Sequence, residues 1–368
     1  MEGFYIAAIQ MAAGIGAAAA SALLGKCSSA EQAWKITADE LATVRGLTQQ
    51  QQENFLSFRN SNLLLPEKLA EECNQKHIMV CSQQDEVYPE ILKEIHRPPL
   101  VLFYRGELRS DGLHIAMVGS RKATPYGKNI AESLAGELAG AGATVVSGAA
   151  YGIDTASHKG AISKGRTIAV LGCGADIAYP ASNRRLLEEI AESGAVISEY
   201  PPGTRPIAAF FPARNRIISG LSRGTVVVEA AERSGSLITA EMALSEGRDV
   251  FAVPGSIFSD QSRGTNRLIQ QGAKLVQSAW DILDEYMEGP GHSDRKNKEQ
   301  LPELTPDEAA VYGVLSCEQP LSADEIIYRL NGSNVSNIAY LLLQMELKGI
   351  IKEDCDHNYL KTVKEGQL

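Results

Sequence analysis

The sequence predicts an α/β fold in which a mostly parallel sheet lies between a small helical N-terminal domain and a C-terminal winged helix. From His77 onward, short apolar runs alternate with helical stretches, which is typical of parallel strands joined by crossover helices. The stretch before His77 shows helical periodicity alone. A polar segment rich in Gly, Pro and charged residues, 288–303, precedes a final group of short elements.

Residues 1–72 are predicted to form a small helical domain with a helix-hairpin-helix character. Two helical hairpins fit residues 6–62, with turns at Gly14-Ile15-Gly16 and Arg45-Gly46-Leu47. Such a turn can hold a phosphate on backbone amides, but alanines rather than Lys or Arg follow the first one, which favours a packing role. The uncharged run 6–25 is weakly apolar and has no Lys or Arg before it, so we expect soluble helices rather than a membrane segment.

Residues 75–287 are predicted to form a Rossmann-like domain. Thr124 and Pro125 are a good N-cap and first-turn pair for the helix after the third strand. The expected strands cover residues 78–81, 100–104, 114–119, 144–147, 167–172, 195–199, 225–229 and 249–253.

Residues 288–303 are predicted to be a linker and residues 304–368 a winged helix. Helices are expected at 306–315, 322–330 and 334–348, followed by a hairpin near 349–360. A winged helix often reads DNA through its third helix, but residues 335–347 contain no Lys or Arg. A protein-interaction or structural role fits this segment at least as well.

Composition narrows the classes of function. The chain has 368 residues and a formal net charge of −10, so nucleic-acid binding would need a local basic patch. The six cysteines form no Cys-x-x-Cys pair, which predicts neither a zinc site nor a disulfide framework. No Walker A, His-Glu-x-x-His or Gly-x-Ser-x-Gly pattern occurs, so the sequence predicts no metal site and a protein that is not an enzyme.

Loops that could bind anions follow several of the expected strands, at the edge where open α/β sheets hold their ligands. Gly119-Ser120-Arg121-Lys122 places two cations at a helix start. A second, glycine-rich loop is Ser147-Gly148-Ala149-Ala150-Tyr151-Gly152-Ile153-Asp154, in which Gly148 would let the backbone approach a phosphate. Asp154 and His158 are one helical turn apart, but Asp154 is better explained as a helix cap with His158 as its neighbour than as half of an acid–base pair. Gly172-Cys173-Gly174 lacks the final glycine of a dinucleotide fingerprint.

The most informative segment, 204–224, has no Asp or Glu and carries Arg205, Arg214, Arg216 and Arg223 together with Phe210 and Phe211. Arginines bind phosphate oxygens bidentately and exposed aromatics stack on unpaired bases, a combination that suits single strands. The alternative is that the phenylalanines belong to the core. Ser234-Gly235-Ser236, at the start of a helix ending near Gly247, is a further anion cradle.

The chain resembles the DprA/Smf (DNA-processing protein A) family. Gly119-Ser120-Arg121, the glycine-rich run 147–154, Pro212-Ala213-Arg214-Asn215-Arg216, Arg233-Ser234-Gly235-Ser236 and Gly247-Arg248-Asp249 with Pro254-Gly255 carry the resemblance, strongly over residues 75–287. Many members have a helical SAM-like or helix-hairpin-helix domain in front and a winged helix behind. The resemblance implies a cytoplasmic protein that binds and protects incoming single-stranded DNA in natural transformation, displaces single-strand-binding protein and loads the recombinase RecA. It implies no cofactor.

The resemblance also assigns residues. The key DNA-binding arginine corresponds to Arg121, and homodimers would form through the last part of the domain, where Leu244, Ile269 and Leu275 are candidates, with ordinary core as the alternative. Some relatives have a Lys after the Tyr-Pro of the third loop, where this chain has Ala181 and offers Arg184 and Arg185 a turn later. The expected single-stranded DNA site comprises Gly119, Ser120, Arg121, Lys122, Gly148, Arg184, Arg185, Phe211, Arg214, Asn215, Arg216, Ser234, Gly235 and Ser236.

Two other functions are compatible with the sequence. A nucleotide-processing enzyme similar to the LOG phosphoribohydrolases would use Glu229 as catalytic acid or ribose ligand, although the Pro-Gly-Gly-x-Gly-Thr run of those enzymes is replaced by Arg233-Ser234-Gly235-Ser236. A pure interaction scaffold would show no change in DNA affinity when Arg121 is replaced.

Overall fold

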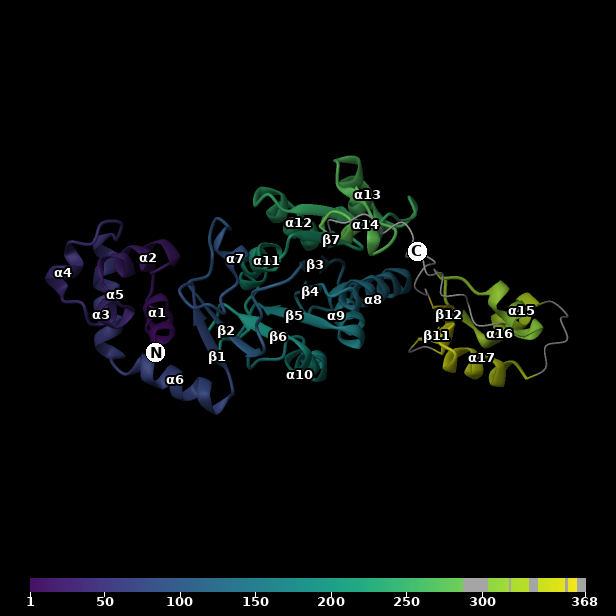
Figure 1. Ribbon diagram of the computed structural model, residues 1–368, viewed down its shortest axis with the longest axis horizontal. Coiled ribbons are helices and arrows are strands. Elements are labelled where there is room, and N and C mark those ends of the chain that lie inside the picture. The colour runs from purple at the N-terminus through teal and green to yellow at the C-terminus, as the bar shows by residue number, and fades with distance from the viewer. Residues whose placement is uncertain (287–303, 318, 331–336, 355–356, 363–368) are drawn as a thin grey trace.

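A nine-stranded sheet forms the centre of the computed structural model, which describes residues 1–286, 304–317, 319–330, 337–354 and 357–362 (Figure 1). All eight predicted strands are present, each within two residues of its expected ends. The two-residue β9 at the edge was not predicted. The strands are β1 (Met79–Ser82), β2 (Val101–Gly106), β3 (His114–Val118), β4 (Thr144–Ser147), β5 (Arg166–Leu171), β6 (Ala195–Ser198), β7 (Gly224–Val227), β8 (Asp249–Ala252) and β9 (Lys274–Leu275).

The strand order is β1-β2-β6-β5-β4-β3-β7-β8-β9. All neighbours from β6 to β9 are parallel, whereas β2 pairs antiparallel with both β1 and β6. The chain builds outward from β3 to β6 and then returns to the other side of β3 with β7. The direction of winding therefore reverses between β3 and β7, and ligands of open α/β sheets bind beside such a reversal, at the carboxyl ends of the strands.

Helices cover both faces of the sheet, as a doubly wound fold requires. Alternate residues of one strand face opposite layers: Ile115 and Met117 pack with α8 and α9, whereas Ala116 and Val118 share a core with α11 and α12. The remaining helices of this region border the same sheet. They are α7 (Glu90–Lys93), α8 (Pro125–Gly140), α9 (Ile153–Lys164), α10 (Arg184–Ser193), α11 (Phe210–Gly220), α12 (Gly235–Ser245), α13 (Arg263–Gln270) and α14 (Trp280–Leu283), with single 3-10 turns at Ala181–Asn183 and Asp260–Ser262.

The N-terminal helices pack directly on the edge of the sheet. They are α1 (Glu2–Gln10), α2 (Ala17–Lys26), α3 (Ala30–Lys35), α4 (Ala38–Ala42), α5 (Gln49–Ser61) and α6 (Leu65–Gln75). The uncharged run 6–25 is divided between α1 and α2, and Ile6 and Ile9 are buried in a core that continues into Val101 and Phe103 of β2. Within the described residues, no helix combines the length and the apolar character that crossing a membrane requires.

The C-terminal elements form a separate small core. The helices α15 (Pro306–Val314), α16 (Ala323–Leu330) and α17 (Ile338–Leu347) enclose Val311, Ile326 and Met345, beside an antiparallel sheet ordered β10-β12-β11. Its strands are β10 (Leu321–Ser322), β11 (Ile351–Glu353) and β12 (Asn358–Lys361). The expected linker 288–303 and the expected start of the third helix lie outside the described residues, so the winged-helix assignment and the domain boundaries stay predictions.

Candidate nucleic-acid interface

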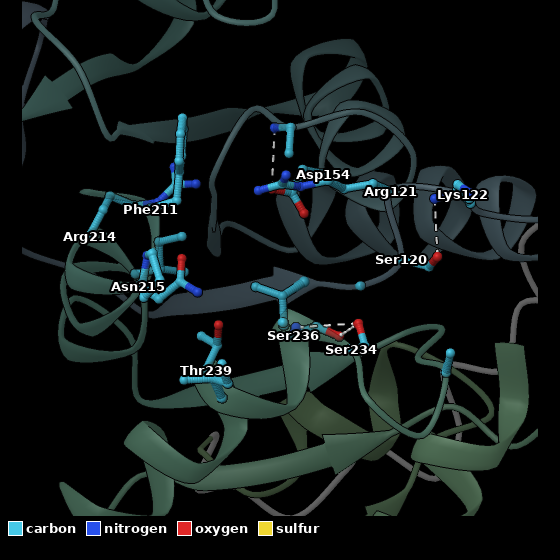
Figure 2. Close-up of a pocket in the computed structure, with 18 of the residues that line it drawn as sticks. Ser120, Arg121, Lys122, Asp154, Phe211, Arg214, Asn215, Ser234, Ser236 and Thr239 are labelled. Atoms are coloured by element: carbon cyan, nitrogen blue, oxygen red, sulfur yellow. Dashed lines mark hydrogen bonds between the residues drawn. The ribbon is translucent and has the colours of Figure 1, made fainter. Parts of the chain in front are cut away.

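A cleft of about 660 Å³ opens at the carboxyl ends of β3 and β7, where the winding of the sheet reverses (Figure 2). Its charged lining residues are Arg121, Lys122, Arg214 and Asp154. The described lining thus has three cations and one carboxylate, a local basic site in an acidic chain. The complete lining is Val118, Gly119, Ser120, Arg121, Lys122, Ala150, Asp154, Tyr179, Pro206, Ala208, Phe211, Pro212, Arg214, Asn215, Ile218, Ala231, Ser234, Gly235, Ser236, Ile238, Thr239 and Gln261.

The loop that carries Arg121 is held at both ends by Glu229, which follows β7. Ser120 N donates to the Glu229 backbone oxygen (2.8 Å), while Thr124 donates to the carboxylate from its N (2.9 Å) and its Oγ1 (2.5 Å). Thr124 in turn caps α8, as predicted, by accepting from Gly127 N. A Cβ at Gly127 would lie 2.2 Å from Glu229 Cδ, so this helix can approach the carboxylate only because residue 127 is glycine.

Glu229 itself does not line the cleft. Its side chain is buried beneath α8, and burial raises the pKa of its carboxyl, an effect that the Thr124 hydrogen bonds oppose. Both carboxylate oxygens are already acceptors for Thr124. The group on which the phosphoribohydrolase alternative depends is therefore occupied in holding the Arg121 loop.

Arg121 extends into the cleft beside an aromatic pair. Its Cζ lies 5.6 Å from the centroid of the Phe211 ring, within the range of a cation–π contact. The Phe211 and Tyr179 rings are 5.2 Å apart at an interplanar angle of 33°. Phe210 is stacked on Tyr200 with centroids 4.1 Å apart, and the described lining of the cleft includes only Phe211 of the two phenylalanines.

Arg214 belongs to the wall of the cleft and is only 3% exposed. Its Nη1 donates to the carbonyl oxygens of Gly148 (2.8 Å) and Val170, and its Nε has no hydrogen-bond partner within the described part of the chain. Burial lowers the pKa of Arg214 to about 10, and the nearby Asp154 carboxylate opposes that shift. Arg214 thus has a structural role at the same place where it could meet a ligand.

Asp154 and His158 do not form an exposed acid–base pair. The Asp154 carboxylate accepts from Ala150 N (3.3 Å), and burial raises its pKa while the charge of Arg214 lowers it. His158 is completely buried, with Nδ1 2.7 Å from Thr167 Oγ1. Burial and the charge of Arg214 lower the pKa of His158 to about 3. The expectation that the two residues are not an acid–base pair thus agrees with this geometry, but Asp154 is not the cap: the N-cap of α9 is Gly152, which makes no side-chain cap hydrogen bond.

The N-terminus of α12 faces the opposite side of the cleft. Ser234 caps the helix by accepting from Ser236 N (3.4 Å), and the two hydroxyl oxygens lie 2.8 Å apart. Figure 2 shows Ser234 and Ser236 on one side of the cavity and Arg121 on the other. Amides and hydroxyls at a helix start favour an anion, so a phosphate could be held between this cap and Arg121.

The structure separates the other arginines from the cleft. Arg216 pairs with both carboxylate oxygens of Glu199 (2.6 Å each), and Arg185 pairs with Glu189 (2.9 Å). Arg184 is exposed. Arg223 precedes β7 and therefore lies at the amino ends of the parallel strands, whereas the cleft is at their carboxyl ends. None of these four is among the described lining residues.

The sequence predicted that Gly148 would let the backbone approach a phosphate. In the structure, the group that lies close to Gly148 is the Arg214 guanidinium. A Cβ at this position would lie 2.6 Å from Arg214 Nη2. Sequence reasoning did not select Tyr179, Thr239 or Gln261, which also line the cleft. The Tyr-Pro pair was a usable signal for Tyr179, but nothing in the sequence linked Gln261, in the loop after β8, to the other loops.

The residues expected at a dimer interface come from three elements: Leu244 from α12, Ile269 from α13 and Leu275 from β9. Leu244 is 59% exposed and Leu275 is 41% exposed, so the alternative that they are ordinary core does not hold. Ile269 is half-buried and packs against the core. Leu275 belongs to β9, the edge strand.

Comparison with known proteins identifies the family. The family model described as DNA recombination-mediator protein A matches residues 79–287. The chain belongs to this family. The DNA recombination-mediator protein A region thus contains the whole nine-stranded sheet and every described residue of the cleft.

Other members of the DNA recombination-mediator protein A family agree with this assignment. The chain is 50% identical over 210 residues to the DNA processing protein DprA of Streptococcus pneumoniae, covering 55% of this chain and 72% of that protein. It is 35% identical over 365 residues to the protein Smf of Synechocystis, covering 89% of this chain and 91% of that protein. These relationships give the chain a DNA-processing role in recombination.

Solved structures of family members share the fold. The X-ray structure of DprA from Streptococcus pneumoniae has a TM-score of 0.68 and 37% identity, covering 78% of this chain and 99% of that one. DNA processing protein A from Helicobacter pylori, whose structure concerns its single-stranded DNA binding mode, has a TM-score of 0.52 and 31% identity, covering 57% of this chain and 96% of that one.

Proposed function

We propose that this chain binds single-stranded DNA in the cleft between the Arg121 loop and α12. The observation that carries the proposal is the Arg121 guanidinium, beside the Phe211–Tyr179 pair and across the cavity from the Ser234 cap. Arg121 and Lys122 would neutralise phosphates, and backbone amides at the start of α12 would donate hydrogen bonds to a phosphate oxygen. One unpaired base would stack on the aromatic pair.

The aromatic pair is also the reason to expect a preference for single strands. A base in a duplex is stacked on its neighbours and cannot offer its face to Phe211 without first being unpaired. Base–aromatic stacking contributes roughly 1–3 kcal/mol per base, which a duplex would forgo. We therefore propose single-stranded rather than double-stranded DNA as the ligand.

The cellular role that we propose is that of a mediator in natural transformation and recombination. The protein would protect incoming single strands, displace single-strand-binding protein and load RecA, acting in the cytoplasm as a homodimer. Family membership supports this role. Two exposed leucines, Leu244 on α12 and Leu275 in the edge strand β9, support self-association, because the edge of a sheet is a ready template for pairing.

We propose binding rather than catalysis as the activity of the cleft. The one carboxylate among its described lining residues, Asp154, is buried against Arg214 and accepts a backbone hydrogen bond. Glu229 is committed to Thr124. The described lining therefore offers phosphate and base contacts without a free carboxylate to act as acid or base.

Fluorescence anisotropy with a labelled oligothymidylate and its duplex form, over a series of salt concentrations, tests the proposal. We expect salt-sensitive binding that favours the single strand and is strongly weakened by Arg121→Ala. Arg223→Ala is the matched control, because it removes an exposed arginine from the same basic segment at the opposite edge of the sheet. Equal affinity of wild type and Arg121→Ala would refute the proposed site and favour the scaffold hypothesis.

A further inference from the structure

Phe258 is the most exposed large apolar side chain in the described part of the molecule. It is 90% exposed, and its neighbour Ile257 is 76% exposed. Both lie in the loop that follows β8. Water-exposed aromatic rings of this kind are typical of positions that meet a partner.

The loop that carries Phe258 adjoins the cleft. Gln261 O accepts from Ala230 N (2.7 Å), and Ala230 O accepts from Gly264 N (2.8 Å), so the two segments are joined on both sides. Gln261 and Ala231 themselves line the cleft. Because β8 is parallel to β7 and next to it, this loop emerges at the same edge of the sheet as the phosphate-binding loops.

The turn is held in one conformation rather than being a free loop. Asn266 donates to Gly255 O (3.0 Å) and accepts from Gly255 N (3.2 Å), which closes the base of the turn. At its tip, Phe258 N donates to Ser256 Oγ (3.3 Å) and Ser259 N donates to Ser256 O (3.0 Å). The ring is thus presented from an ordered backbone, which lowers the entropy lost when a ligand binds.

We propose that Phe258 is a second base-stacking position, which takes an unpaired base of the strand as it leaves the cleft. The inference rests on the proposed function, and it extends the DNA contact beyond the residues that line the cavity. Every base has a π face, so one exposed ring can hold any nucleotide without reading its sequence.

The surroundings of the ring favour a base over a second protein surface. Ser256 and Ser259 flank the apolar pair, and Arg263 with Asp260 forms an exposed ion pair (3.2 Å) at the end of the loop. The turn is therefore electrically neutral and does not repel a phosphate backbone. Two apolar side chains within a polar turn make a small patch for a protein interface, whereas a single base needs only one ring.

The first experiment uses the full chain with Phe258→Trp as a fluorescent reporter. The chain has two other tryptophans, Trp34 and Trp280, and neither is among the described lining residues of the cleft, so titration of the wild type supplies the background. We expect the added tryptophan to be quenched when oligothymidylate binds, because a base stacks on it. An unchanged difference spectrum at saturating oligonucleotide would overturn the proposal.

The second experiment compares Phe258→Ala with oligonucleotides of increasing length. Affinity should fall about tenfold for strands long enough to extend past the cleft, a loss typical of one stacked base, and should not change for the shortest strands that still bind. Ile257→Ala, its exposed apolar neighbour, is the matched control and should keep nearly wild-type affinity. Equal affinity of Phe258→Ala and wild type at every length would overturn the proposal.

Two further results separate this inference from the proposed function. If Phe258→Ala abolishes self-association in sedimentation while DNA affinity is unchanged, the ring belongs to an interface between copies and the proposal is wrong. If Arg121→Ala leaves DNA affinity intact while DNA still quenches Phe258→Trp, the proposed cleft fails but the stacking position stands.

Discussion

Arg214 lies against Gly148 in a contact that leaves no space for a side chain at residue 148. Arg214 Nη1 donates to the Gly148 carbonyl oxygen at 2.8 Å, and a Cβ on Gly148 would approach Nη2 to 2.6 Å. The same guanidinium also donates to Val170 O of β5. One buried arginine therefore ties α11 to the loop after β4 and to the end of β5.

Replacement of Arg214 should reduce stability as well as binding. Arg214→Ala leaves two buried carbonyl oxygens and the Asp154 carboxylate without their cation, which should cost about 3 kcal/mol in the free energy of unfolding. Arg121→Ala, at an exposed position, should change that free energy by less than about 0.5 kcal/mol. Urea unfolding of the two variants checks the contrast, and equal stabilities would contradict the structural role of Arg214.

Glu229 should affect DNA binding through the Arg121 loop without touching DNA. Glu229→Ala removes the acceptors of Thr124 and should weaken single-stranded DNA binding in anisotropy measurements. In a double-mutant cycle, adding Glu229→Ala to Arg121→Ala should cause little further loss, because both changes act on one element. Fully additive losses would show that Glu229 acts elsewhere.

Glu137→Gln is a control for the Glu229 experiment. Glu137 is on α8, and burial raises the pKa of its carboxyl as it does for Glu229. It does not line the cleft, so its replacement should leave DNA affinity unchanged. Protection of the Thr124 amide from hydrogen exchange gives a readout independent of DNA, and it should fall in Glu229→Ala alone, because that amide donates to the Glu229 carboxylate.

The sheet could be predicted because each buried strand is a short apolar run between helical segments. Thr144–Ser147 was placed to the residue, since turn residues flank it on both sides. β9 was not predicted because it has only two residues, Lys274 and Leu275, and two residues are too few to show the alternation of a strand. The first loop of the candidate site, Gly119 to Lys122, could also be recognised from local sequence, because it lies between a strand and a capped helix.

The membership of the cleft could be predicted only in part, because linear spacing does not show which partner an arginine meets. Arg216 lies two residues from Arg214 on α11, yet it pairs with Glu199 at the end of β6. Arg223 lies beyond the helix, at the opposite edge of the sheet. Such partners come from distant parts of the chain, and only the folded arrangement reveals them.

Charge at the proposed dimer surface should dissociate the protein. Leu244→Glu and Leu275→Glu place carboxylates on exposed apolar positions, which would repel their counterparts across a twofold interface. We expect monomers in analytical ultracentrifugation at concentrations where the wild type is dimeric. Leu347→Glu, at an 80% exposed leucine of α17, is the matched control and should not alter the sedimentation. An unchanged mass for both edge variants would exclude this surface.

Stability should fall as the pH is lowered, in part because of His158. Its pKa is about 3 in the folded chain, against an ordinary value of 6.5, because burial and Arg214 disfavour the charged form. Between these two values the unfolded chain binds a proton that the folded chain does not, so this contribution to stability is complete above about pH 6.5 and is lost progressively below it.

Urea unfolding of wild type and His158→Gln over this pH range measures the contribution. The glutamine can keep the hydrogen bond to Thr167 but cannot be protonated, so the variant should show a shallower decline, by up to about 1.4 kcal/mol per pH unit. His114, whose pKa is also lowered by burial, should preserve part of the slope. At pH values well above 6.5 imidazole is neutral in both states, so there the difference between the two proteins should be constant. Parallel curves at lower pH would mean that His158 is protonated equally in the folded and unfolded chains.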